Sequence, residues 1–173
     1  MEGTSIRGYM NLRFEDFRRM VRGDTLSPYE KIGFPDSYRR RKEEAIFGDI
    51  LGKLTNLRKT GKTVVDIGPG CSDLPRMLID LCRRKGHPLV LIDSREMLDH
   101  LPDEPFIVKV PGRYPGECGW LFERYAGKVD AVLCYSALLS SFPSSCGAAS
   151  RGLTPTGYPS PTSLPCPTGG KTF

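Results

Sequence analysis

The strongest constraint on this chain is a short apolar run that ends in a carboxylate and passes into a glycine turn. Residues 63–67 (Thr-Val-Val-Asp-Ile) are predicted to form a buried strand, and Gly68-Pro69-Gly70 follows it before a helix begins at Ser72 or Asp73. A second buried strand is predicted over 89–93, and it also ends in a carboxylate. Strand, turn, helix and strand in this order predict a parallel α/β sheet with a ligand pocket at the carboxyl ends of its strands.

The residues of the turn discriminate between nucleotide-type ligands. Gly68 and Gly70 allow backbone angles that are closed to other residues, and they carry no side chain that would keep a ligand away. A dinucleotide-binding turn has a third glycine where this chain has Asp73, and a carboxylate there would repel phosphate. The phosphate-binding sequence G-x-x-x-x-G-K-[ST] is also absent. The turn therefore predicts a nucleoside ligand without phosphates, preferably one that carries positive charge.

Asp93, at the end of the second strand, agrees with a nucleoside ligand. An acidic side chain at this distance beyond the glycines is placed to accept hydrogen bonds from both hydroxyls of a ribose. Such charge-assisted bonds contribute roughly 1.5–3 kcal/mol each. Ser94 and Met97 follow directly and are placed to border an adenine.

Three segments resemble motifs of class I S-adenosylmethionine-dependent methyltransferases: 64–72 (Val-Val-Asp-Ile-Gly-Pro-Gly-Cys-Ser), Asp93, and 129–136 (Val-Asp-Ala-Val-Leu-Cys-Tyr-Ser). The resemblance covers about residues 36–139. It implies a Rossmann-like, doubly wound fold. Strands that alternate with helices at this spacing also predict a parallel sheet with right-handed crossovers and the strand order 3-2-1-4. The structural expectation is thus an α/β fold whose sheet is incomplete at the C-terminus, because the pattern stops after Ser136.

The resemblance also implies roles for individual residues. Asp66 and the backbone of Gly68, Pro69 and Gly70 would face the methionine part of S-adenosylmethionine. Asp93 would bind its ribose with Ser94 beside it, and Tyr135 would border the transferable methyl. The cofactor carries a sulfonium and no phosphate, so it fits the acidic turn.

No catalytic residue can be named. Many small-molecule O-methyltransferases have a histidine after the fourth strand, where this chain has Ala137, Leu138 and Leu139. His87 and His100 are both expected on the surface, away from the strand ends. The third-strand region also offers no carboxylate to the adenine amino group.

Periodicity and punctuation predict the elements along the chain. Gly48 and Gly52 weaken a predicted helix, so their spacing indicates close approach to a neighbouring element. The expected helices are 12–22, 36–58, 73–85, 95–100 and 120–125; the expected strands are 63–67, 89–93, 106–110 and 129–135; residues 27–35 are expected to form an ordered loop.

These elements divide the chain into three parts. Residues 1–35 form an N-terminal cap or lid. Tyr29 and Phe34 within it, and Tyr38 just after it, either cover the cofactor or pack the cap. Residues 36–139 form the S-adenosylmethionine-binding domain. The tail over 140–173 contains six prolines and no Asp or Glu, and we expect it to be disordered. The abrupt change in composition at the start of this tail has two interpretations: an altered reading frame that begins near Leu139, or a natural disordered tail.

Composition points to a soluble cytoplasmic protein. No apolar stretch approaches membrane-spanning length, and the first twenty residues lack the apolar centre of a secretion signal. The six cysteines form no C-x-x-C pair and no zinc-ligand spacing, so we interpret them as reduced thiols and expect no metal site. The net charge of +5 derives in part from the basic run 39–42, which is interpreted as a solvated helix start rather than a nucleic-acid surface.

Three functions remain open. The first is a methyltransferase, or a truncated copy of one, that acts on a small-molecule or sugar-containing acceptor; residues 27–38 resemble bacterial methyltransferases associated with surface-glycan gene clusters. The second is an NAD(P)-dependent oxidoreductase, which Asp73 and the lack of an evident Tyr-x-x-x-Lys pair disfavour. The third is a non-catalytic nucleotide-binding fragment that associates through the apolar edge 129–133. The oligomeric state is not predicted.

Overall fold

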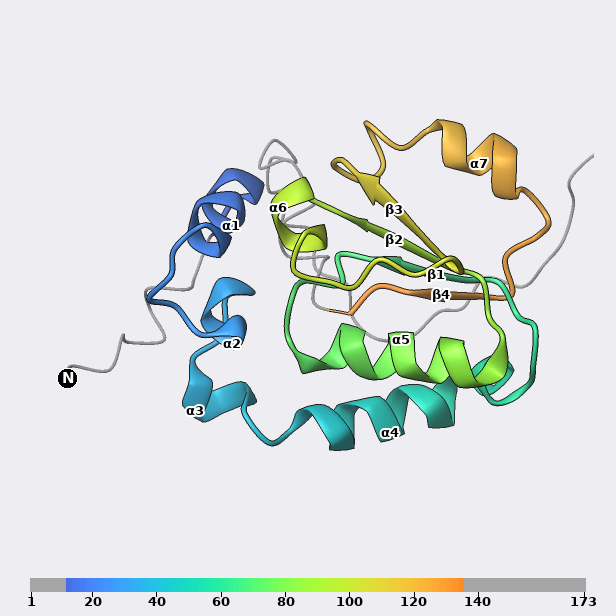
Figure 1. Cartoon of the computed structure of the whole chain (residues 1–173), viewed down its shortest axis with the longest axis horizontal. Helices are drawn as coiled ribbons and strands as arrows, with labels where there is room; N and C mark the ends of the chain where they lie inside the picture. Colours follow the sequence, from blue (N-terminus) through green and yellow to red (C-terminus); the bar gives the residue numbers. More distant parts are fainter. Residues whose placement is uncertain (1–11, 136–173) are drawn as a thin grey trace, which may run out of the picture. The chain divides into compact units, whose positions relative to one another are not determined.

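The computed structural model describes residues 12–135, in which several helices precede the first strand and helices and parallel strands then alternate (Figure 1). These residues belong to one structural unit, and the predicted tail over 140–173 lies outside them. The strands are β1 (Val64–Ile67), β2 (Leu89–Asp93), β3 (Ile107–Pro111) and β4 (Ala131–Leu133). The helices are α1 (Phe14–Val21), α2 (Pro28–Lys31), α3 (Asp36–Arg39), α4 (Glu43–Lys53), the 3-10 helix η2 (Thr55–Arg58), α5 (Asp73–Lys85), α6 (Arg95–Leu98) and α7 (Trp120–Tyr125).

The sheet has the order β3-β2-β1-β4, and every pairing is parallel. The predicted α/β, Rossmann-like class and its 3-2-1-4 order are therefore confirmed. β1 lies between β2 and β4, and both faces of the sheet pack against core residues there, which explains why every β1 residue except Asp66 is apolar. Among residues 12–135, the outer edges of β3 and β4 pair with no further strand, so the sheet is not closed.

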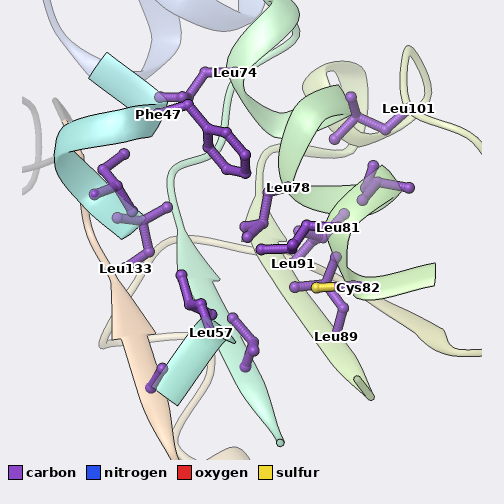
Figure 2. Close-up of a cluster of buried hydrophobic side chains, with 14 of the residues drawn as sticks. Phe47, Leu57, Leu74, Leu78, Leu81, Cys82, Leu89, Leu91, Leu101 and Leu133 are labelled. Atoms are coloured by element: carbon purple, nitrogen blue, oxygen red, sulfur yellow. The ribbon is translucent and has the colours of Figure 1, made fainter. Parts of the chain in front are cut away.

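One face of the sheet packs against α4 and α5 and forms the larger core (Figures 1 and 2). Side chains alternate between the faces of a strand, so Leu89 and Leu91 of β2 both point into this core. α5 has the predicted bounds because Ser72 precedes it and Gly86, with φ of 65°, ends it. Leu78 and Cys82 of α5 are completely buried, and full burial of a leucine stabilises the fold by roughly 1.5–3 kcal/mol.

The opposite face of the sheet is covered less completely. Val90 and Ile92 of β2 point to this side and pack with Leu121 of α7. An apolar cavity of about 200 Å³ lies between the strands and α7. Val132 of β4 is 52% exposed there, which leaves part of this face open at the β4 edge.

The predicted helix over 36–58 is wrong as one continuous element. α3 ends at Arg39, Arg40 has an extended backbone, and Arg41 has φ of 66° before α4 begins. A residue with a side chain rarely adopts this left-handed conformation, and no glycine at this position indicated a break in the helix. The break turns Arg39 inward to 4% exposure, so the interpretation of the basic run as solvated is wrong for Arg39 and holds for the exposed residues 40–42.

Two further expectations for the N-terminal half are corrected. The expected loop over 27–35 contains α2, which a capping box of Ser27 and Glu30 begins and Pro28 favours at its first position. Gly48 and Gly52 make no close approach, because a Cβ at either position would meet no atom within 4 Å. Both glycines lie on the exposed side of α4, opposite the buried Phe47 and Ile50.

His87 is buried and not on the surface as predicted, whereas His100 is exposed as predicted. Lys62 N–H donates to Nδ1 of His87 over 2.8 Å, and Nε2 lies 3.2 Å from the Leu57 carbonyl oxygen. Nδ1 is thus the acceptor and Nε2 carries the proton. The neutral imidazole joins the η2 segment to the start of β1, a structural role that its turn-like sequence context did not indicate.

The described cysteines agree with the prediction, and the bounds of β3 and β4 differ from it. Cys71, Cys82, Cys118 and Cys134 are free, and the first three are buried, as expected of packing thiols; Cys146 and Cys166 lie outside the described residues. β4 is shorter than the predicted 129–135, and β3 begins and ends one residue later than predicted. Within residues 12–135, no helix is both long and apolar enough to cross a membrane.

Candidate functional site

A cavity of about 90 Å³ lies at the carboxyl ends of the central strands, where the sheet order changes direction between β1 and β4. Parallel sheets of this kind bind ligands at this position. The cavity wall contains five of the predicted site residues: Gly68, Pro69, Gly70, Asp93 and Tyr135.

The glycine turn between β1 and α5 adopts the conformation that its sequence requires. Gly68 and Gly70 have φ of 68° and 69°, in the left-handed region that glycine tolerates without strain. Gly70 also leaves room for the cap, because a Cβ there would lie 2.5 Å from Cγ2 of Ile32. The backbone of the turn is thereby exposed to the cavity on one side and held by the cap on the other.

Asp93 joins the end of β2 to the glycine turn. Its carboxylate accepts the Gly70 N–H over 2.9 Å and the Ser94 N–H over 2.7 Å. Burial raises the pKa of Asp93 to about 6, against the lowering effect of these two N–H bonds. An ionised carboxylate has about four acceptor positions, so two remain for a ligand.

Ser94 and Asp66 lie close to the cavity but do not line it. The Ser94 hydroxyl caps α6, where it accepts the Met97 N–H over 3.3 Å. Asp66 is 3% exposed, and its strand alternation with Ile67 places it on the face of β1 that α5 covers. Burial, and then the charge of Asp93, raise the pKa of Asp66 to about 8. The two carboxyl groups are therefore neighbours on adjacent strands.

The hydroxyl group of Ser72 is a polar group in the cavity wall that has no hydrogen-bond partner among the described residues. Ser72 is the residue before α5, but its side chain makes no capping bond. Its Oγ is buried. Because an unpaired buried hydroxyl is costly, this atom fits a ligand bound against the glycine turn.

The N-terminal cap covers the cavity from the other side. Phe14 and Phe17 of α1 and Ile32 after α2 line it. Tyr29, Phe34 and Tyr38, for which both a lid role and packing of the cap were open, do not line it. The amphipathic spacing of α1 was the available signal for these residues, which the sequence reasoning missed.

Three polar contacts hold this cap in place. Arg18 of α1 and Arg22, which follows that helix, bind Glu96 of α6, and the hydrogen bond from Arg18 contributes most to lowering the pKa of Glu96 to about 2. The Tyr29 hydroxyl donates to Asp73 at the start of α5, which raises the pKa of Tyr29 to about 12. Asp73 thus serves as an anchor for the cap as well as a negative charge at the turn.

Two arginines also line the cavity, and neither was predicted. Arg113 follows β3 and is exposed, whereas Arg39 is buried and ion-paired with Glu43. The basic run gave no sign that Arg39 is buried, and its contact with the Tyr135 ring joins distant parts of the chain. Within residues 12–135, no group of three or more Asp, Glu, His or Cys side chains is arranged to hold a metal ion.

Comparison with known proteins gives little to add to this geometry. No family model matches the chain, and no curated protein matches it. Among solved structures, the chain is similar to a crystal structure of a mutant of MtNAS, with 18% identity and a TM-score of 0.33. The similarity covers 61% of this chain and 41% of that chain, so this chain spans less than half of the matched structure. A likeness at this level identifies neither a family nor an activity.

Proposed function

We propose that this chain binds S-adenosylmethionine at the carboxyl edge of its sheet and serves as the cofactor-binding part of a methyltransferase. The acceptor class we propose is a small or sugar-containing molecule. The observation that carries the proposal is the contact between Asp93 and the Gly70 N–H, which places a carboxylate of β2 and the glycine turn of β1 in one cavity.

The nucleoside part of the cofactor matches the Asp93 side of this cavity. The two remaining acceptor positions of Asp93 could accept hydrogen bonds from the 2′ and 3′ hydroxyl groups of a nucleoside ribose. Met97 and Phe17 line the cavity nearby and pack in one apolar cluster, which offers a surface for an adenine ring. Ser72 Oγ adds an unpaired hydroxyl beside the turn.

The charge of the cofactor matches the buried carboxyl groups. Raised pKa values at Asp66 and Asp93 mean that ionising these groups in the free protein is costly. A nearby cation reduces that cost, so a ligand with a sulfonium and an ammonium group is favoured over a neutral nucleoside or a polyphosphate. The negative charge of Asp73 at the start of α5 would repel phosphate groups.

In methyl transfer the bound cofactor supplies both the methyl group and its own sulfur leaving group. The contribution of the protein is then to orient two reactants and exclude water, which is worth several kcal/mol in well-aligned systems. Asp93 and the glycine turn would fix the nucleoside. The cap residues Phe14, Phe17 and Ile32 would shield the cavity from solvent.

Isothermal titration calorimetry with S-adenosylmethionine tests the proposal. Asp93→Ala should weaken binding at least a hundredfold, because two charge-assisted hydrogen bonds of roughly 1.5–3 kcal/mol each are lost. Asp80→Ala is the matched control, since Asp80 is an exposed carboxylate on α5 outside the cavity wall. Equal affinity of wild type and Asp93→Ala would refute the proposed ribose contact, and NADH should not bind to either protein.

A further inference from the structure

The guanidinium of Arg39 is a buried cation in the wall of the candidate site. Its side chain is 5% exposed, and Nε donates to Oε1 of Glu43 over 2.8 Å. Arg39 nevertheless lines the same cavity as Gly70 and Asp93. A charged group is costly to bury, so N–H groups of Arg39 that have no partner indicate a place for a ligand.

Two aromatic rings fix the plane of this guanidinium. Its central carbon lies 5.0 Å from the ring centroid of Phe34 and 5.0 Å from that of Tyr135. Contacts of this kind favour a cation and restrict its rotation. Because rings lie against the guanidinium, a further partner must approach its N–H edges.

The ion pair with Glu43 leaves most of those edges unused. Oε2 of Glu43 is buried and has no hydrogen-bond partner among residues 12–135, so the pair is a single-point contact. A guanidinium has five N–H donors, and the described residues accept only the one on Nε. The two terminal nitrogens form an edge that matches the two oxygens of a carboxylate.

The position of Arg39 indicates which part of a ligand would meet it. Asp93 ends β2, whereas Tyr135 follows β4, and β1 with its glycine turn lies between these strands. Met97, which we propose to border the nucleobase, belongs to α6 directly after β2, so the nucleobase of a ribose held by Asp93 would lie on the β2 side. The group attached at its other end would then extend across the turn toward Tyr135 and Arg39.

We infer that Arg39 is a carboxylate-recognition residue at the β4 end of this cavity, an inference that rests on the function proposed above. The carboxylate comes either from the amino-acid end of the cofactor or from an acidic methyl acceptor. Both sources present the same two oxygens to the same N–H edge. Glu43, Phe34 and Tyr135 position the guanidinium for this contact.

Calorimetry with three ligands tests the inference. S-adenosylmethionine has the carboxylate, decarboxylated S-adenosylmethionine lacks only that group, and 5′-methylthioadenosine lacks the amino-acid end altogether. If the cofactor supplies the carboxylate, wild type should prefer S-adenosylmethionine over its decarboxylated analogue by roughly ten- to a hundredfold. Arg39→Met combined with Glu43→Gln removes both charges of the buried pair and should abolish this preference without changing 5′-methylthioadenosine binding.

Acetate, observed by saturation-transfer NMR, distinguishes the two sources. Wild type with bound 5′-methylthioadenosine should bind acetate in either case. S-adenosylmethionine should block acetate if its own carboxylate meets Arg39, and should leave acetate bound if Arg39 faces the acceptor. The double variant should bind no acetate in either complex.

The control variant is Lys53→Met with Asp49→Asn, which removes an exposed ion pair of the same spacing on α4. Arg39→Lys keeps the charge without the two-nitrogen edge and should also reduce the carboxylate preference, so it replaces the double variant if that protein does not fold. Unchanged ligand preference and acetate binding in these Arg39 variants would overturn the inference alone. Absence of binding of both S-adenosylmethionine and 5′-methylthioadenosine to wild type would refute the proposed function, and the inference with it.

Discussion

Asp66 should make the fold less stable as pH rises, and Asp66→Asn should remove that dependence. Burial, reinforced by the charge of Asp93, raises the pKa of Asp66 from 3.8 to about 8 in the folded protein. Between these values the folded state holds a proton that the unfolded chain has released. The contribution of Asp66 to stability is therefore complete below the unfolded pKa and is lost as pH approaches the folded pKa.

The size of this effect follows from one proton. Each pH unit within the window costs about 1.4 kcal/mol, so wild type should lose roughly 3 kcal/mol of folding free energy between pH 5 and pH 7 through Asp66. The pKa of Asp93 is raised to about 6, so Asp93 also lowers the stability of the fold as pH rises, but only up to about pH 6. Asp93 is present in both proteins, so the difference between wild type and Asp66→Asn isolates Asp66.

Urea denaturation at pH 5, 6 and 7 and constant ionic strength measures the free energy of unfolding of both proteins. The stability of Asp66→Asn relative to wild type should increase steadily over this range. Asp80→Asn is the control, because Asp80 is exposed and carries no comparable burial. A difference between wild type and Asp66→Asn that is the same at pH 5 and pH 7 would show that Asp66 is ionised in the folded protein.

Two other changes test the glycine turn and the cap. Gly70→Ala should destabilise the protein more than Gly61→Ala in thermal denaturation: both residues have positive φ, which costs roughly 1–2 kcal/mol with a side chain, but only the Gly70 Cβ would meet Ile32. Adding Ile32→Ala should recover that excess, and equal losses from the two glycine variants would argue against the contact. Glu96→Gln should loosen α1 and accelerate trypsin cleavage at Arg18, and an unchanged cleavage rate would mean that apolar packing alone holds the cap.

The parts of the fold that the sequence predicted correctly depend on local signals. α5 has the predicted ends because Ser72 and Gly86 mark them, and β2 has the predicted ends because an apolar run stops at Asp93. The strand order followed from the crossover pattern, since strands joined by helices pair in parallel. The candidate turn residues also lie together, because Gly68 to Gly70 and Asp93 end adjacent strands.

The expectations that failed depend on contacts between distant residues. Arg39 contacts the ring of Tyr135, and His87 forms hydrogen bonds with backbone groups of Lys62 and Leu57. The two residues of each pair lie far apart in the sequence, so a local pattern could not indicate these contacts. No contact among the described residues explains the left-handed Arg41 that divides the predicted helix. Patterning therefore located the turn and the strand ends, but it did not show how the cap closes over them.

The pairing of β1 has a consequence for the order in which a nascent chain can assemble. β2 follows β1 after one helix, whereas the partner on its other edge is made much later, with Val64 opposite Ala131. Asp130 secures this late junction by accepting the Thr63 N–H and the Lys62 ammonium. Until the ribosome has released that stretch, the edge of β1 that faces β4 has no strand to pair with.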